Sequence, residues 1–495
     1  MTLSTETGQH PLKDWVPGTR TLLVGGAEVQ PEGESWDVFN PATEEVIGTV
    51  AGASSRQVDD AVAAARAAFP AWAALSGEER SRHIHRLADV LEAAADRLLP
   101  SIVNEVGTPV SLAEYLQVKM AVQEHLRWAA EAAKQERIQH LGGYDKPHPT
   151  MSDVVHQPVG VVAAITGYNY PLNLAVFKFG AALAAGCTVV LLPSPRTPLT
   201  TLFLGDLIRE AGLPDGVMNV IIGGADVGQQ LSAHPGVDKV SFTGSDGVGA
   251  KIMAQAAANL TDVTLELGGK SPTLILPGVD VQQIAVEMHL RWARNGGQGC
   301  AALARILVHD ALYDEFLEAG ASAFDQMVVG DPWDRATNIG PMIRPDHQAR
   351  VRGFIDGSVA EGGRKLLEVT RPLPEKGWFV NPVLLGGLPH SARAVQEEIF
   401  GPVAVIVPFK DTDEAIRLAN DTPYGLAANV WCGEDLAEGR RVAEQIRAGT
   451  VWINGGGSMR PDAPFGGYGR SGVGRELGEW GVHEYLEAKH IQWRV

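Results

Sequence analysis

Hydrophobic residues recur at helical spacing through the first part of the chain. Residues 56–72 are rich in alanine, and residues 78–99 continue the pattern with apolar positions three and four apart. This spacing predicts amphipathic helices, so we expect the first third of the chain to be largely helical. We interpret these helices as packing elements.

From Gly160 the pattern changes to short β-type runs that alternate with longer helical ones. Such alternation is typical of a parallel sheet with crossover helices, a doubly wound unit that binds ligands at the carboxyl ends of its strands. We predict strands at 160–166, 188–192, 217–222, 239–242 and 263–267, and helices at 172–185, 199–211, 227–233 and 245–258.

A second alternating set begins near Thr273, with strands expected at 306–308, 403–407, 428–431 and 451–453. At 495 residues the chain is too long for a single hydrophobic core, so two α/β domains are expected. We predict a Rossmann-like cofactor-binding domain from residues 1–136 and 156–265, a catalytic domain at 266–455, and an active site in the cleft between them.

Two segments fit neither domain. Residues 137–155 show little helical period and end in β-type residues, and the C-terminal residues of 480–495 alternate apolar and polar positions. We predict that 137–155 and 480–495 form a small β oligomerisation arm. The expected assembly is a homodimer or homotetramer.

Composition narrows the possible partners and the compartment. The net charge of −18 argues against nucleic acid or an anionic membrane surface as a partner, since both would be repelled. The three cysteines are too scattered for a disulfide framework, no metal-ligand spacing occurs, and residues 1–9 lack the apolar core of a signal peptide. We expect a cytoplasmic protein with no metal site.

Candidate chemistry lies at Glu266 and Cys300. Glu266 ends an apolar strand, where a carboxylate is as often a surface charge, and Cys300 follows Asn295-Gly-Gly-Gln-Gly, although a free cysteine is commonly just a small buried hydrophobe. Glycines let the backbone bend sharply near a ligand, and Asn295 and Gln298 add amide donors. Together a base and a thiol are the parts that covalent catalysis needs.

An anionic cofactor requires backbone amides at a helix N-terminus. Phe242-Thr-Gly244-Ser245 supplies a strand end, a glycine and a hydroxyl just before a helix, and residues 223–228 offer a second such turn. Neither has the usual G-x-G-x-x-G fingerprint, and each alone also fits an ordinary strand-to-helix turn.

With these segments in view, the chain resembles the aldehyde dehydrogenase superfamily, in its hydrolytic type that does not acylate coenzyme A, from about Phe39 to the C-terminus. The motifs that carry the resemblance are Phe39-Asn-Pro-Ala-Thr43, Tyr168-Asn-Tyr-Pro-Leu172, the 242–245 turn, the Glu266 and Cys300 segments, Glu398-Ile-Phe-Gly-Pro402 and Pro464-Phe-Gly-Gly-Tyr468.

The resemblance implies NAD(P)-dependent oxidation of an aldehyde to a carboxylic acid. Cys300 would attack the aldehyde, Asn169 would hold the oxyanion, and Glu266 would activate the water that hydrolyses the thioester. Lys178 matches a lysine near the oxyanion site, although a solvated helix charge is equally expected. The resemblance places the cofactor against Thr166, Tyr168, Phe242, Gly244, Ser245, Val248, Leu267, Glu398 and Phe400.

Two positions depart from the family pattern. A lysine and a glutamate that usually hold the adenosine ribose are replaced by Leu192 and Pro195. Ser194 or Arg196 would be near a 2′-phosphate, so NADP is possible, although NAD is the expected cofactor.

The resemblance also places the substrate pocket at Tyr170, Leu174, Phe177 and Phe465, with Tyr168 beside them. Their apolar and aromatic side chains suit a medium-sized aromatic or aliphatic aldehyde. Arg460 leaves open a semialdehyde that carries a carboxylate. Two further alternatives are a nitrilase- or amidase-like hydrolase that uses Cys300, Glu266 and Lys270, and a catalytically retired binding protein.

Overall fold

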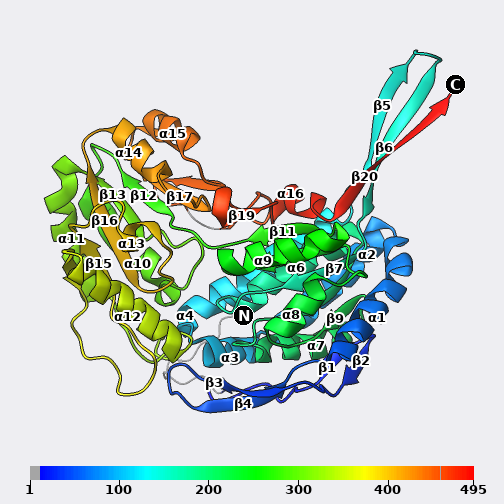
Figure 1. The fold of residues 1–495 in the computed structure, drawn as a ribbon, viewed down its shortest axis with the longest axis horizontal. Helices are drawn as coiled ribbons and strands as arrows, with labels where there is room; N and C mark the ends of the chain where they lie inside the picture. The colour runs from blue at the N-terminus through cyan, green and yellow to red at the C-terminus, as the bar shows by residue number, and fades with distance from the viewer. Residues whose placement is uncertain (1–11, 457–458) are drawn as a thin grey trace.

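The computed structural model describes residues 12–456 and 459–495, arranged as two α/β bodies with a projecting arm (Figure 1). The larger body is built on an eight-stranded sheet, and its five central strands run parallel. In spatial order this sheet comprises β19 (Gly472–Val473), β11 (Asp262–Glu266), β10 (Lys239–Thr243), β7 (Val161–Ile165), β8 (Thr188–Leu192), β9 (Met218–Val220), β1 (Leu22–Val24) and β2 (Ala27–Val29).

Both faces of this sheet are buried, which explains the continuous apolar runs of its central strands. In β7, Val162 and Ala164 pack into one hydrophobic cluster while Val161 and Ala163 pack into another on the opposite face. The helices of this body are α1 (Ser55–Ala73), α2 (Gly77–Ala93), α3 (Ala95–Val106), α4 (Val110–Ala113), the π-helix η1 (Glu114–Leu126), α5 (Arg127–Ala132), α6 (Pro171–Ala185), α7 (Leu199–Ala211), α8 (Ala225–Ser232), α9 (Asp246–Ala256) and the 3₁₀ turn η2 (Ala257–Asn259).

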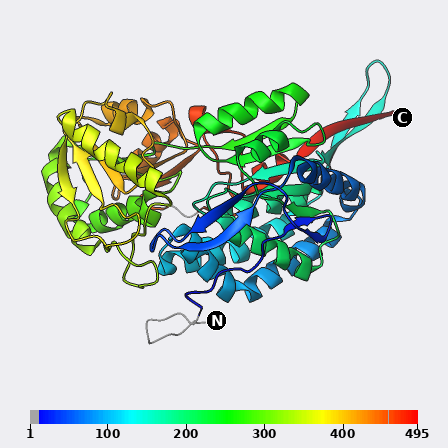
Figure 2. The same ribbon diagram turned by 60° about the horizontal axis from the view of Figure 1, so that its bottom comes forward.

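The smaller body contains a seven-stranded sheet, parallel except for one edge strand, and Figure 2 shows it beside the larger body. Its strands in order are β14 (Arg364–Glu368), β15 (Val383–Gly386), β16 (Val403–Phe409), β13 (Arg305–His309), β12 (Pro272–Ile275), β17 (Ala427–Trp431) and β18 (Thr450–Ile453). Its helical segments are α10 (Val281–Ala293), η3 (Arg294–Gly297), η4 (Asp310–Leu312), α11 (Tyr313–Gln326), α12 (Pro345–Ala360), α13 (Arg393–Gln396), α14 (Thr412–Asn420) and α15 (Leu436–Gln445).

The C-terminal segment returns from the smaller body to the larger one. It contains η5 (Gly469–Ser471), β19 and α16 (Gly478–His483), and β19 pairs with β11 of the larger sheet. It then enters the arm, a three-stranded sheet in the order β20 (Leu486–Arg494), β6 (Thr150–Pro158), β5 (Ile138–Tyr144). The two predicted arm segments therefore pair with each other within one chain.

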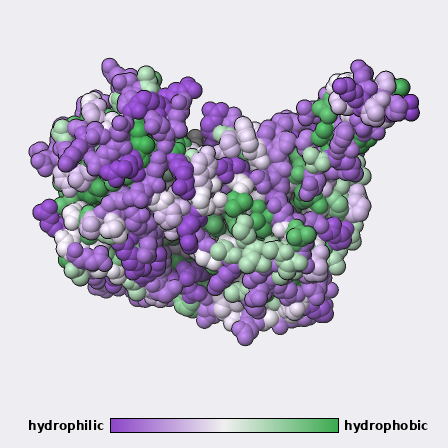
Figure 3. Space-filling model, turned by 45° about the horizontal axis from the view of Figure 1, so that its top comes forward, coloured by the Kyte–Doolittle hydropathy of each residue, from purple (hydrophilic) through white to green (hydrophobic). Residues whose placement is uncertain are grey.

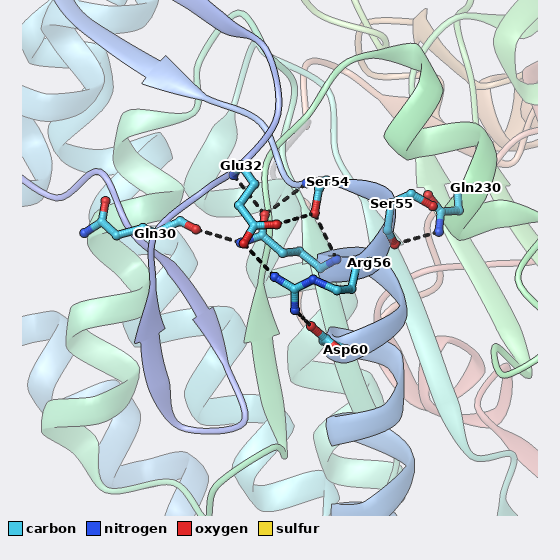
Figure 4. A network of polar contacts seen from close by, with 8 residues as sticks. Gln30, Glu32, Ser54, Ser55, Arg56, Asp60 and Gln230 are labelled. Atoms are coloured by element: carbon cyan, nitrogen blue, oxygen red, sulfur yellow. Dashed lines mark hydrogen bonds and ion pairs between the residues drawn. The ribbon is translucent and has the colours of Figure 1, made fainter.

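The start of α1 illustrates how local sequence fixes an element. Ser54 and Gln57 form a capping box, in which Gln57 Oε1 accepts a hydrogen bond from the Ser54 backbone N–H at 3.0 Å. Arg56 joins Glu32 and Asp60 at 2.6 Å each, as Figure 4 shows. This network ties the helix to the segment that leads into β3 (Ser35–Phe39), which pairs with β4 (Val46–Ala51).

The first third of the chain departs in part from the expectation. The helical pattern over 78–99 is divided between two helices, because Ala94 leaves helical geometry at φ −92° and ψ 7°. The region is also less helical than expected, since four short strands, β1 to β4, lie between Leu22 and Ala51. Strands of three to six residues give too little periodicity to stand out in a sequence.

Candidate active site

The carboxyl ends of the central strands bring several predicted site residues to one edge of the larger sheet. In the parallel register, Thr243 of β10 lies opposite Glu266 of β11, and Phe242 lies opposite Ile165 of β7. Thr166 and the Tyr168-Asn169-Tyr170 segment follow β7 directly and lead into α6. This is the edge at which a doubly wound sheet binds ligands.

Cys300 approaches this edge on a loop between η3 and β13. The loop bends through left-handed backbone at Asn295 (φ 52°), Gly296 (φ 63°) and Gly297 (φ 70°). A Cβ on Gly297 would lie 2.1 Å from the Gly401 carbonyl, so no other residue fits there. The glycines that drew attention in the sequence therefore fix the path of the loop.

The loop is held by hydrogen bonds from the larger body. Asn169 Nδ2 donates to the Gln298 carbonyl at 2.9 Å, and the Tyr168 hydroxyl donates to Gln298 Oε1 at 3.1 Å. Gln298 Nε2 donates to the Asn295 and Pro341 carbonyls, each at 3.0 Å. The expectation that Gln298 offers an amide donor to a ligand is thus wrong, because both of its polar atoms are already bonded.

Asn295 is also engaged within the protein. Its Oδ1 accepts from the Thr108 hydroxyl at 2.7 Å, and its Nδ2 donates to the Asn169 carbonyl at 3.2 Å. Gln117 of η1 donates to the same Thr108 hydroxyl at 2.8 Å. These contacts position Asn169 and the Cys300 loop together.

Glu266 is a buried carboxylate with no partner. It is 3% exposed, and neither oxygen has a hydrogen bond within the part of the chain that the structure describes. Burial raises the pKa of Glu266 well above its usual value, and the nearby Glu476 carboxylate raises it further. A buried carboxyl with a raised pKa is suited to proton transfer near neutral pH.

A buried ion pair stands next to Glu266. Lys178 Nζ lies 2.5 Å from Glu476 Oε1 and 3.2 Å from the Ser241 hydroxyl, and both charged side chains are at most 3% exposed. Lys178 is therefore not a solvated helix charge. Glu476 was missed in the sequence, because its place depends on a two-way backbone bridge with Phe465, at 2.7 Å in each direction.

Cys300 is partly exposed, and the Glu266 and Glu476 carboxylates act on its thiol electrostatically. Burial raises the pKa of the Cys300 thiol to about 12, and the Glu266 and Glu398 carboxylates add to the increase. The thiol is consequently protonated at neutral pH, so its use as a nucleophile requires a neighbouring proton acceptor.

The turn at 242–245 has the features of an anion site. Ser245 is the N-cap residue of α9 and its side chain makes no capping hydrogen bond, while the Gly247 amide donates to Asp246 Oδ1 at 2.8 Å. A Cβ on Gly244 would meet the Phe242 ring at 2.3 Å, so the ring covers the turn closely. Val248, in the first turn of the helix, is 44% exposed.

Buried polar atoms without partners line the same edge. The hydroxyls of Thr166 and Thr243 and the carboxylate of Glu266 are buried and have no hydrogen-bond partner among residues 12–456 and 459–495. Unsatisfied buried groups cost free energy, so their gathering at the strand ends fits a polar ligand that would bond to them. Leu267 continues this edge and packs closely against Gly249 of α9.

Glu398 and Phe400 reach the edge from the smaller body. Glu398 Oε1 accepts from the Gly269 amide at 3.1 Å, and burial raises the pKa of Glu398 to about 7. Phe400 adopts left-handed backbone at φ 59° and packs edge-on against Tyr168 with ring centroids 5.9 Å apart. Arg350 donates to the carbonyls of Glu398 and Ile399 at 2.7 and 2.5 Å.

Leu192 and Pro195, which stand in place of the family's ribose-binding lysine and glutamate, make other contacts in this structure. Leu192 is 2% exposed inside the hydrophobic cluster, and the Pro195 carbonyl accepts from the Trp36 indole at 2.8 Å. Arg196 lies over the Tyr168 ring at 5.5 Å and pairs with Asp346 at 3.1 Å. Of the two residues considered for a 2′-phosphate, Arg196 is thus already paired.

The predicted substrate pocket is a separate apolar cluster. Leu174, Phe177 and Phe465 are 5–8% exposed and form a cluster against which Tyr170 and Cys300 pack. Figure 3 shows apolar surface gathered on the larger body, in the middle of this face. Arg460 is 69% exposed and paired with Asp462 at 2.7 Å, so it is held away from a role in an apolar pocket.

Among residues 12–456 and 459–495, no three His, Cys, Asp or Glu side chains are grouped so that they could hold a metal ion. Within the same ranges, no helix is both long enough and apolar enough to cross a membrane.

Comparison with known proteins identifies clear relatives. The profile of the aldehyde dehydrogenase family matches residues 29–491. A geranial dehydrogenase of Castellaniella defragrans is 39% identical over 478 residues, covering 95% of this chain and 98% of the relative.

Solved structures of aldehyde dehydrogenases are also similar to this chain. An aldehyde dehydrogenase C variant from Pseudomonas syringae, complexed with NAD+ and octanal, is 38% identical with a TM-score of 0.92, covering 98% of each chain. A Staphylococcus aureus betaine aldehyde dehydrogenase in complex with NAD+ is 36% identical with a TM-score of 0.92, covering 96% of this chain and 95% of that one.

Proposed function

The chain belongs to the aldehyde dehydrogenase family, and on that premise we propose that it oxidises a medium-sized aromatic or aliphatic aldehyde to the free acid through a covalent intermediate on Cys300. The observation that carries this proposal is the buried, unbonded Glu266 carboxylate close enough to the Cys300 thiol to raise its pKa. A base and a thiol in one water-poor site are the minimum for acyl chemistry at cysteine.

In the first step Cys300 Sγ gives its proton to solvent water and forms a bond to the aldehyde carbon, so Glu266 stays unprotonated for the later hydrolysis. The aldehyde oxygen becomes an oxyanion, which the Asn169 amide and the Cys300 backbone amide stabilise in the thiohemiacetal. Asn169 suits this task because Gln298 and Asn295 fix its position before the substrate arrives. Preorganised donors of this kind act without reorganisation during the reaction.

In the second step the thiohemiacetal loses a hydride and becomes a thioester. NAD, when bound, accepts that hydride. We propose that Thr166, Tyr168, Leu267, Glu398 and Phe400 hold its nicotinamide end, since the unbonded Thr166 hydroxyl and the Glu398 carboxylate face the strand edge. Phe242, Gly244, Ser245 and Val248 would hold its pyrophosphate at the start of α9.

In the third step Glu266 removes a proton from water, whose oxygen attacks the thioester carbon. The carbon–sulfur bond breaks, Cys300 recovers its proton and the carboxylic acid leaves. Lys178 and Glu476 set the charge beside Glu266, since the Lys178 ammonium lowers its pKa while the Glu476 carboxylate raises it. Hydrolysis, rather than transfer to coenzyme A, follows from the presence of this base.

The pocket supports an apolar substrate. Leu174, Phe177 and Phe465 provide buried apolar walls beside Cys300, and the Pseudomonas relative was solved with octanal. A carboxylate-bearing semialdehyde has weaker support, because the candidate cation Arg460 is solvated and paired. The hydrolase alternative has no observation in its favour once the family is known.

We also propose that the arm joins two copies of the chain. In the antiparallel register Trp493 lies opposite Met151, and Ile491 and Ile138 project from the same face of the sheet. All four side chains are at least 37% exposed. A row of exposed apolar side chains on one face of a projecting sheet fits an interface with a second subunit.

The test of the proposed function is reduction of NAD or NADP, followed by absorbance, with nonanal, benzaldehyde and succinate semialdehyde. We expect reduction of NAD with the first two aldehydes and none in Cys300→Ala. Tenfold higher kcat/KM with NADP would overturn the cofactor assignment. Higher activity on succinate semialdehyde than on benzaldehyde would overturn the substrate class.

A further inference from the structure

His125 is a buried polar residue that has no role in the proposed mechanism. It is 3% exposed, and neither ring nitrogen has a partner in hydrogen-bond geometry within the described part of the chain. Buried imidazole nitrogens are normally bonded, so an unbonded pair needs an explanation. A ligand that enters from the substrate pocket would supply one.

His125 borders that pocket. Its ring packs edge-on against Phe177 with centroids 4.6 Å apart, and Phe177 belongs to the apolar cluster that contains Cys300 at its margin. The Met459 backbone, which packs against the same cluster, lies beside the His125 ring. His125 therefore stands in the pocket wall among otherwise apolar neighbours.

The element that carries His125 is itself unusual. It is the π-helix η1, and π-helical turns occur frequently at functional sites. Another residue of η1, Gln117, reaches Thr108 and the Asn169 carbonyl at 2.8 and 3.4 Å. The same helix thus contacts both the oxyanion region and the pocket wall.

The protonation state of His125 limits which ligand it can bind. Burial lowers the pKa of His125 to about 4, while the Met459 backbone opposes this only in part. The ring is therefore neutral at physiological pH, with one N–H and one bare nitrogen. Because the Met459 carbonyl favours the N–H on its own side, the other ring nitrogen is left bare and can accept a hydrogen bond.

We propose that His125 is a specificity-determining residue that accepts a hydrogen bond from a hydroxyl group on the substrate, so that the preferred aldehydes carry a hydroxyl remote from the carbonyl. This inference rests on the proposed function of the Cys300 site. A neutral acceptor in an apolar wall selects a hydroxyl over a methyl group of similar size, and it disfavours a carboxylate, which has no proton to donate.

The test compares kcat/KM for isosteric pairs, 4-hydroxybenzaldehyde against 4-methylbenzaldehyde and 8-hydroxyoctanal against nonanal. In the wild type we expect the hydroxyl member of at least one pair to be preferred. In His125→Phe that preference should fall by roughly 3- to 10-fold, as expected for one neutral hydrogen bond. The comparison of both enzymes on both substrates cancels the effect of the hydroxyl on aldehyde reactivity.

Two further variants separate specificity from structure. His125→Gln keeps polar atoms in the wall and should retain part of the preference. His289→Phe removes another buried histidine with an unbonded ring nitrogen, packed among Phe316, Phe324 and Trp292 rather than at the Cys300 cluster, and should leave the ratio unchanged.

The outcomes are distinct. No hydroxyl preference in either wild-type pair, or an equal ratio in His125→Phe and the wild type, would overturn the role of His125 while the proposed function stands. A preference for succinate semialdehyde that depends on His125 would also overturn it, in favour of a carboxylate. Failure to oxidise any aldehyde would instead remove the proposed function itself.

Discussion

Replacement of Asn169 by alanine tests the oxyanion site most specifically. Asn169 Nδ2 already bonds the Gln298 carbonyl at 2.9 Å, and the side chain is 6% exposed. If the amide also binds the oxyanion, loss of that donor should lower kcat by roughly 100- to 1,000-fold, or about 2.7–4 kcal/mol of transition-state stabilisation. The assay is steady-state reduction of NAD with an apolar aldehyde.

The same substitution has a structural cost that must be separated from the catalytic one. It leaves the buried Gln298 carbonyl without its donor, which costs about 1–3 kcal/mol of stability. Asn173→Ala is a matched control, because Asn173 is 3% exposed in the first turn of α6, which directly follows the Asn169 segment, and its amide donates to the Leu116 carbonyl. It should lose similar stability, measured by thermal unfolding, but keep kcat within about fivefold, well short of the loss of one oxyanion donor.

The reasoning would be refuted by two results. If Asn169→Ala retains kcat within tenfold of the wild type, the amide does not stabilise the transition state. If Asn173→Ala loses as much kcat as Asn169→Ala, the effect belongs to the packing of the helix start and not to a donor at the reacting oxygen.

Three further predictions concern charge and assembly. Glu476→Gln removes a carboxylate that raises the pKa of Glu266, so the acidic limb of the kcat–pH profile should move to lower pH; a shift to higher pH would contradict the assignment. Lys178→Met leaves a buried carboxylate unpaired and should cost about 3–5 kcal/mol of stability; an unchanged unfolding midpoint would argue against the ion pair. Trp493→Lys should shift the sedimentation coefficient toward that of a single chain, whereas Leu436→Lys, at another exposed apolar side chain, should not.

Much of the fold was predictable because the central strands are buried on both faces. Strand 188–192 and helix 199–211 occur at the predicted residues, since a continuous apolar run and an amphipathic helix are strong local signals. The break at Ala94 was not predictable, because it lies within Ala93-Ala94-Ala95, where every residue favours a helix. Tertiary packing decides such a break.

Site residues were predictable only where a reactive side chain and the sequence motif around it lie in the same segment. Glu266 ends its strand as expected, and Asn169 contacts the Cys300 loop. The Lys178–Glu476 pair joins residues 298 positions apart, so no local pattern could show it. The sequence also could not show that the polar atoms of Gln298 bond within the protein.

The most direct test of covalent catalysis is mass spectrometry of Glu266→Gln after one turnover with nonanal and NAD. Without the base, hydrolysis should stall, so the account predicts an acyl group attached to Cys300 together with one equivalent of reduced cofactor. The wild type, which hydrolyses the thioester, should carry much less of the adduct. Reduced cofactor with no adduct on Cys300 in the variant would contradict the account.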